Sequence, residues 1–175
     1  MKTAIKIICA LLLSATALWA VDAKKNWKAP AHKIYAQQLS DEIMTNNPDL
    51  ISITFHGVPP GLSKVYTMFA GSYLERIGNP DDPDDVMIIE LGITMLDPRW
   101  HRMKDPAKKF VMMMPLRNAS GENIGLLVAA YKNPEFKPNG SNAKLEAEFY
   151  AKGTKLRDEL QVKIPSYEGL FTPVK

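Results

Sequence analysis

"FVMMMPLRNASGENIGLLVAAY", residues 110–131, decides the fold that we predict for this chain. The stretch holds two apolar runs, residues 110–116 and 124–131, joined by RNASGEN, whose asparagine, serine and glycine residues are typical of turns. Runs that are apolar at consecutive positions are typical of strands covered on both faces. We therefore predict an antiparallel hairpin at the centre of a sheet.

The methionine triplet in this hairpin has two possible roles. Thioether sulfurs ligate copper in some exported proteins. On a strand, however, Met113 points away from Met112 and Met114, so the three sulfurs cannot converge on one ion. We therefore expect these flexible side chains to fill the core.

Upstream, "ISITFHGVPP", residues 51–60, alternates between apolar and polar side chains through its first six positions. Such alternation predicts a strand, residues 50–56, with two unlike faces. The apolar face carries Ile51, Ile53 and Phe55, and the polar face carries Ser52, Thr54 and His56. A loop with two prolines follows at residues 57–61, and residues 65–70 are a second predicted strand.

Three helices are predicted around these strands. Residues 32–46 and 141–161 show apolar side chains at helical spacing, with Ser141 as the expected cap of the second helix and Gly153 as a weak point worth about 1 kcal/mol. The aspartates of residues 81–85 precede a short apolar helix, residues 83–94. Because an N-cap aspartate, Pro83 and first-turn acids suit a helix start, we interpret this cluster as a cap and not as a metal site.

The remaining segments carry weaker signals. Residues 71–79 are ambiguous, residues 96–108 read as a polar connection, residues 133–140 as a loop, and residues 164–173 as a tail. The order helix, strand, strand, short helix, hairpin, helix predicts one α+β domain over residues 31–175.

The first 23 residues have the features of a secretory signal peptide. Lys2 and Lys6 precede an apolar run, residues 7–20, which is shorter than the about 20 residues that span a bilayer. Small residues between Ala20 and Ala23 offer cleavage sites; an uncleaved membrane anchor is the alternative. We expect a periplasmic or secreted bacterial protein with a flexible leader, residues 24–30, and no stable membrane insertion after cleavage.

Composition excludes several classes of function. The single cysteine, Cys9, lies inside the predicted signal, so the mature chain would have no disulfide, zinc–thiolate site, cysteine nucleophile or covalent haem. The whole chain carries a formal charge of +3, and residues 24–175 carry +2. These charges are scattered, whereas nucleic-acid binding needs a basic stripe.

Three stretches of this sequence, ISITFHGVPPG, RIGNPDDPDD and the hairpin quoted above, resemble the extracytoplasmic PAS-like domains of bacterial sensors, the Cache or PDC group. The resemblance spans about residues 31–132. It implies a long N-terminal helix, an antiparallel sheet, and inserted helices that close a small-molecule pocket against one sheet face. Sensors usually continue into a membrane helix, whereas this sequence ends after its final helix, so we expect a small stand-alone exported protein.

Eight residues are candidates for a ligand site. In a PAS-like sheet the polar face of the strand at residues 50–56 lines the pocket, although that face can also be simply solvated. A tyrosine on a strand can place its hydroxyl at a pocket rim, or it can be a core ring whose hydroxyl has a hydrogen-bond partner. An arginine can clamp a carboxylate or form a surface ion pair. The lone acid of the short helix can be a partly buried site residue or can lie on the outer face of the helix. The candidates are Ser52, Thr54, His56, Tyr66, Arg76, Glu90, Arg99 and Tyr131.

The expected function is non-catalytic binding of a small polar or anionic ligand, either to sense it for a protein partner or to sequester it. No metal ligand or cofactor is assigned. One alternative is a protein-interaction module with a filled sheet face. Less favoured alternatives are a haem held by His56 and a methionine, and an enzyme using His56, for which no G-x-S-x-G elbow is present.

Overall fold

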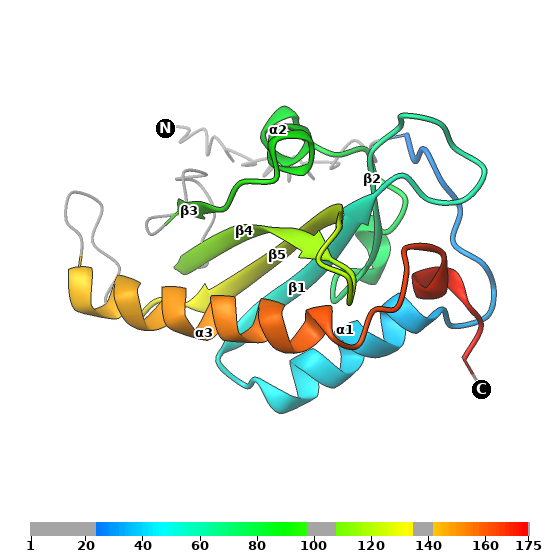
Figure 1. Ribbon diagram of the computed structural model, residues 1–175. Coiled ribbons are helices and arrows are strands. Elements are labelled where there is room, and N and C mark those ends of the chain that lie inside the picture. Colours follow the sequence, from blue (N-terminus) through cyan, green and yellow to red (C-terminus); the bar gives the residue numbers. More distant parts are fainter. Residues whose placement is uncertain (1–23, 98–107, 135–141, 175) are drawn as a thin grey trace, which may run out of the picture.

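The computed structural model describes residues 24–97, 108–134 and 142–174, so the predicted signal peptide lies outside the described residues. Five strands form one antiparallel sheet in the order β2-β1-β5-β4-β3. Their bounds are Leu50–Gly57 (β1), Thr67–Gly71 (β2), Met95–Asp97 (β3), Lys109–Arg117 (β4) and Asn123–Lys132 (β5). With a helix before the sheet, a short inserted helix and a C-terminal helix, this is an α+β fold, which confirms the predicted class and architecture (Figure 1).

The helices divide between the two faces of the sheet. Helices α1 (Tyr35–Asn46) and α3 (Ala143–Gln161) lie side by side on one face, and the short helix α2 (Pro83–Leu91) lies on the other (Figure 1). We call these the helix face and the α2 face. Within the described part of the chain, no helix is both long enough and apolar enough to cross a bilayer.

The predicted hairpin is confirmed and is central. β4 pairs with β5 from Lys109 opposite Lys132 to Arg117 opposite Asn123, β5 also pairs with β1, and β4 also pairs with β3. Strand β3 was not predicted: the sequence left Met95 unassigned and placed Leu96 and Asp97 in a polar connection. Three residues are too few for a periodic signal, and pairing with β4 is what makes them a strand.

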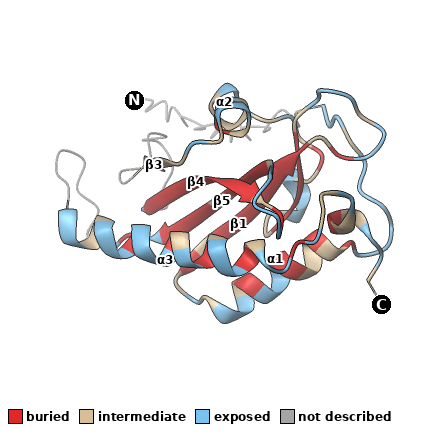
Figure 2. Cartoon of the chain, viewed as in Figure 1, coloured by how far each residue is buried: buried red, intermediate tan, exposed pale blue. Residues whose placement is uncertain are grey.

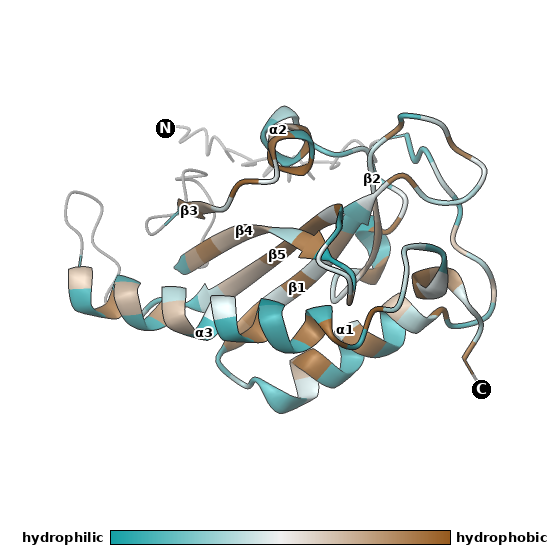
Figure 3. Ribbon diagram, in the orientation of Figure 1, coloured by the Kyte–Doolittle hydropathy of each residue, from teal (hydrophilic) through white to brown (hydrophobic). Residues whose placement is uncertain are grey.

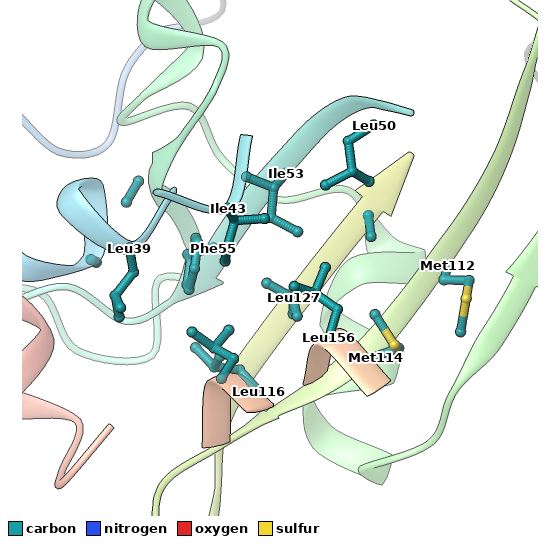
Figure 4. Packing of buried hydrophobic residues seen from close by; sticks show 14 of the residues in the cluster. Leu39, Ile43, Leu50, Ile53, Phe55, Met112, Met114, Leu116, Leu127 and Leu156 are labelled. Atoms are coloured by element: carbon teal, nitrogen blue, oxygen red, sulfur yellow. The ribbon is translucent and has the colours of Figure 1, made fainter. Parts of the chain in front are cut away.

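The helix face carries the larger core (Figure 4). Side chains from the sheet, including Ile53, Phe55, Met112, Met114 and Leu127, meet Leu39 and Ile43 of α1 and Leu156 of α3. Met113 lies in the separate cluster on the α2 face, as the alternation along β4 predicts. Strands β1, β2, β4 and β5 are mostly buried, whereas β3 and the outward faces of α1 and α3 are not (Figure 2).

Gly153 lets α3 approach the sheet closely. The residue is buried, and a Cβ added there would overlap the sulfur of Met112 on β4. The sequence analysis counted only the helix-propensity cost of this glycine, but its missing side chain makes room for Met112. The helix starts later than predicted: the Asn142 side chain accepts a hydrogen bond from the Leu145 amide at 3.1 Å, and Ser141 lies outside the described residues.

The two ends of the described chain contact the domain. The Asn26 amide donates to the Gly78 carbonyl at 2.7 Å, and the Trp27 ring meets Phe171 edge-on at 6.1 Å. Residues 164–173, expected as a tail, include the 3-10 helix η2 (Glu168–Phe171) with Leu170 fully buried. Pro173 forms a β-bridge with Ile34, the residue before α1. Because Ile34 is extended, α1 begins at Tyr35, three residues after its predicted start at residue 32.

The predicted alternation along β1 holds from Ser52 to His56 but fails at Ile51. An irregularity in the pairing with β5 between Leu50 and Ser52 turns Leu50 toward the helix face and Ile51 toward the cluster on the α2 face. The expectation that Ile51 shares a face with Phe55 is therefore wrong, because a bulge shifts the side-chain period by one residue. Ile53 and Phe55 do pack under the helices.

Candidate functional site

The polar residues of β1 border a hollow of about 80 Å³ on the α2 face. Its floor is mainly apolar and comes from four strands: Met68, Val111, Met113, Val128 and Ala130 accompany Ser52, Thr54 and His56. Its charged and aromatic wall residues come from the 3-10 helix η1 (Leu74–Arg76) and the residue before it, from the start of α2, and from β4. They are Tyr73, Arg76, Asp82, Asp84, Asp85 and Lys109.

The aspartate cluster builds the start of α2, as the sequence predicts. Asp82 is the N-cap, and it forms a capping box with Asp85, whose carboxylate accepts from the Asp82 amide at 3.3 Å. Pro83 occupies the first turn. The helix ends before its predicted limit at residue 94, because Gly92 adopts a left-handed conformation (φ 62°) and closes the last turn.

A chain of two short hydrogen bonds runs through His56. Its Nε2 lies 2.7 Å from the Thr54 hydroxyl, and its Nδ1 lies 2.7 Å from Oδ1 of Asp81. A carboxylate only accepts, so Nδ1 carries the proton, and in the neutral imidazole Nε2 accepts from Thr54. The Asp81 side chain is fully buried, and its second oxygen, Oδ2, has no hydrogen-bond partner among the described residues.

The His56–Asp81 pair connects the sheet to the segment that leads into α2. The Asp81 amide donates to the Tyr66 carbonyl at 3.2 Å, and Pro80 bridges Thr67 at the start of β2. Pro80 and Asp81 therefore fix the start of α2 to the sheet just before the N-cap, Asp82.

Burial raises the pKa of the Asp85 carboxyl above its usual range. The attraction of His56 opposes this effect, and the neighbouring carboxylates of Asp81 and Asp84 add to it. A carboxyl with this environment, at the edge of a hollow, is typical of a functional site.

Four of the eight candidate residues line the hollow: Ser52, Thr54, His56 and Arg76. The Arg76 side chain is exposed, and its guanidinium lies 5.6 Å from the centre of the Tyr73 ring. Arg99 lies outside the described residues.

The other three candidates lie elsewhere. Tyr66 contacts Glu90, an exposed residue of α2. Burial and the charged, hydrogen-bonded Glu90 carboxylate raise the pKa of Tyr66. Tyr131 is buried on the helix face, 5.4 Å from Phe149 between ring centres. Since Val128 and Ala130 of β5 face the hollow, strand alternation turns Tyr131 away from it.

The acidic wall, Asp82, Asp84 and Asp85, was not predicted as part of a site. Asp82 and Asp85 cap α2 and also face the hollow. In the sequence their capping role is a sufficient explanation, so nothing indicated the second role. Asp81 precedes the N-cap and takes no part in the capping box. Capping therefore does not explain this aspartate, and that was the one sign of another role in the cluster. Lys109 and Met68 offered no signal, because the strand pairing alone brings them to this face.

No family model matches the chain, and no curated protein matches its sequence. Among solved structures, the chain is similar to the sensor domain of DcuS from E. coli, with 14% identity, a TM-score of 0.38, and coverage of 55% of this chain and 65% of that domain. It is also similar to the inducer-binding domain of a double mutant of the transcription factor PobR from Acinetobacter, solved with 3-hydroxybenzoic acid. That match has 14% identity, a TM-score of 0.43, and coverage of 74% and 97%. Matches with such low identity and TM-scores do not indicate a ligand for this chain, so the hollow itself is the evidence for its function.

Proposed function

We propose that the protein is an exported PAS-like domain that binds a small polar molecule in the hollow on the α2 face. One observation carries the proposal: the row of Ser52, Thr54 and His56 borders a partly enclosed space, so it faces neither the helix core nor open solvent. Binding sites commonly combine an apolar floor with a few such polar groups. The bound molecule would be sensed for a partner protein or sequestered.

The size of the hollow limits the ligand. Pockets for drug-sized ligands measure about 300–1,000 Å³, and the hollow measures about 80 Å³. A molecule with few heavy atoms, such as an amino acid or a short carboxylic acid, suits this volume. A haem does not suit it, because the macrocycle is far larger than the hollow.

The charges of the wall favour a ligand that carries both signs. Asp82, Asp84 and Asp85 offer carboxylates from α2, and Arg76 and Lys109 offer cations from η1 and β4. An ammonium group would be attracted to the α2 side, and the guanidinium of Arg76 suits a carboxylate. Among small polar molecules we therefore place zwitterions first.

Thermal unfolding against a panel of amino acids, amines and short carboxylates tests this function. A ligand at 100 times its Kd adds about 2.7 kcal/mol to the free energy of unfolding. Arg76→Ala should weaken the affinity for the best compound by about fivefold or more, by loss of a charge-assisted hydrogen bond. Lys155→Ala, which removes an exposed cation from α3, is the matched control and should leave the affinity within about twofold. A panel without any shift, or equal losses in both variants, would contradict the proposal.

Hydrolysis is a second candidate function because Thr54, His56 and Asp81 follow the order hydroxyl, imidazole, buried carboxylate. Against it, β1 pairs with β2 and β5, which engages its backbone amides and leaves β1 no oxyanion hole beside Thr54. We expect no release of nitrophenol from nitrophenyl esters above the buffer rate. A rate that both Thr54→Val and His56→Gln abolish would favour the enzyme.

A further inference from the structure

Three side chains, of which His56 and Asp85 line the hollow, bring metal-binding atoms together. His56 of β1, Asp81 before α2 and Asp85 in its first turn each place one such atom within 4.8 Å of the other two. We call them the His–Asp–Asp cluster. It differs from the exposed aspartate cap of α2 because it joins the sheet to the helix and includes an imidazole.

The second observation is the unpaired oxygen of Asp81. The side chain is fully buried, Oδ1 accepts from His56, and Oδ2 has no hydrogen-bond partner among the described residues. Leaving a buried charged acceptor unsatisfied destabilises the folded state. A cation bound to this oxygen would remove that cost, whereas a capping role for Asp81 would not explain it.

The surroundings of His56 suit a metal ligand. Metal-binding histidines usually fix their ring by donating a hydrogen bond from the other nitrogen, and the Thr54 hydroxyl lies 2.7 Å from Nε2 and can accept it. Nδ1 then points toward Asp81 and Asp85 and can bind the ion. A cation would there take the place of the proton that Nδ1 shares with Asp81, and in the neutral imidazole that proton would move to Nε2, which then donates to Thr54.

We propose that Nδ1 of His56 and the carboxylates of Asp81 and Asp85 bind one divalent cation of the Zn²⁺ or Mn²⁺ type. One imidazole and two carboxylates suit these ions, and three protein ligands leave positions open for water or for a ligand in the hollow. Ligand atoms about 2.1 Å from one ion lie about 3 to 4 Å apart, so the cluster closes with small side-chain movements. The inference goes beyond the proposed organic ligand and does not depend on it.

Isothermal titration of chelator-treated protein with ZnCl2, and separately with MnCl2, tests the site. We expect one ion of at least one of the two metals per chain and an affinity reduced tenfold or more in both Asp85→Asn and His56→Gln. The asparagine keeps a capping oxygen, so the start of α2 should persist; thermal unfolding in chelator verifies this. Asp84→Asn is the matched control, because it removes the adjacent carboxylate from the wall but leaves the cluster intact. Its affinity should stay within threefold.

Three results would overturn the proposal. They are no binding of either ion, a stoichiometry other than one, and losses in Asp84→Asn as large as those in Asp85→Asn, which would show general attraction by the acidic wall. Because the titration uses the ion alone, its outcome is separate from that of the compound panel: the cation site can fail while an organic ligand binds, and the reverse.

Discussion

The two faces of the sheet differ in how completely they are covered. On the helix face, α1, α3 and the C-terminal η2 bury a continuous apolar core, and Gly153 brings α3 against Met112. On the α2 face a helix of nine residues contributes one fully buried side chain, Ile88, and a hollow with polar groups remains beside it. The difference indicates that one face supplies stability and the other supplies binding.

The sequence pattern of the helices accounts for this division. Apolar residues follow β4 and β5 almost continuously, so both of their faces need cover, whereas α1 and α3 each combine polar and apolar sides (Figure 3). Two long amphipathic helices cover one face fully. A single short helix cannot cover the other, and the polar residues of β1 lie where its cover ends.

The largest expected effect comes from the helix face. Phe55→Ala should lower the free energy of unfolding by about 3–5 kcal/mol, because Phe55 is fully buried among the helices. Val128→Ala, on a half-buried residue that lines the hollow, should cost about 1 kcal/mol. Urea unfolding at pH 7 measures both, and equal losses would remove the distinction between the faces.

A smaller loss is expected where α3 contacts the sheet. Gly153→Val should destabilise the protein by about 1–3 kcal/mol, because the added atoms overlap Met112 in a filled core. Ala151→Val, on the exposed side of the same helix, carries only the helix-propensity cost of valine and should stay within about 0.7 kcal/mol. If Gly153→Val is no less stable than Ala151→Val, the close approach of α3 is not needed.

On the α2 face we expect a loss of binding with little loss of stability. Thr54→Val removes the hydroxyl that contacts His56 and should cost about 1 kcal/mol of folding free energy. The same change should abolish most of the thermal shift caused by the best compound of the panel. A large loss of stability with unchanged binding would assign Thr54 to the core instead.

The smallest effect concerns alkaline pH and separates a buried tyrosine of the helix face from an exposed one. Burial raises the pKa of Tyr131, with a further contribution from Asp49. The unfolded chain loses this proton near pH 10 and the folded chain does not, so stability should fall as the pH rises above about 10. Urea unfolding between pH 8 and 11 should show a flatter decline in Tyr131→Phe. Tyr150→Phe, on an exposed α3 residue, should match the unchanged protein.

Local patterns predicted most of the fold and four of the residues that line the hollow. Alternation along β1 placed Ser52, Thr54 and His56 on one face, and the cap residues placed the start of α2. The bulge that turns Ile51, the pairing that creates β3 and the register that turns Tyr131 inward depend on neighbouring strands. The partnership of His56 with Asp81, 25 residues later in the chain, required the folded structure.

The most direct test of the account is a map of amide chemical shifts by NMR during titration with the compounds of the panel. The account predicts that at least one compound shifts the amides of β1 around Thr54, of the segment from Asp81 to Asp85, and of β4 near Val111, while α1 and α3 remain unchanged. Shifts centred on α1 or α3, or no shift with any compound, would contradict the claim that the α2 face is the binding face.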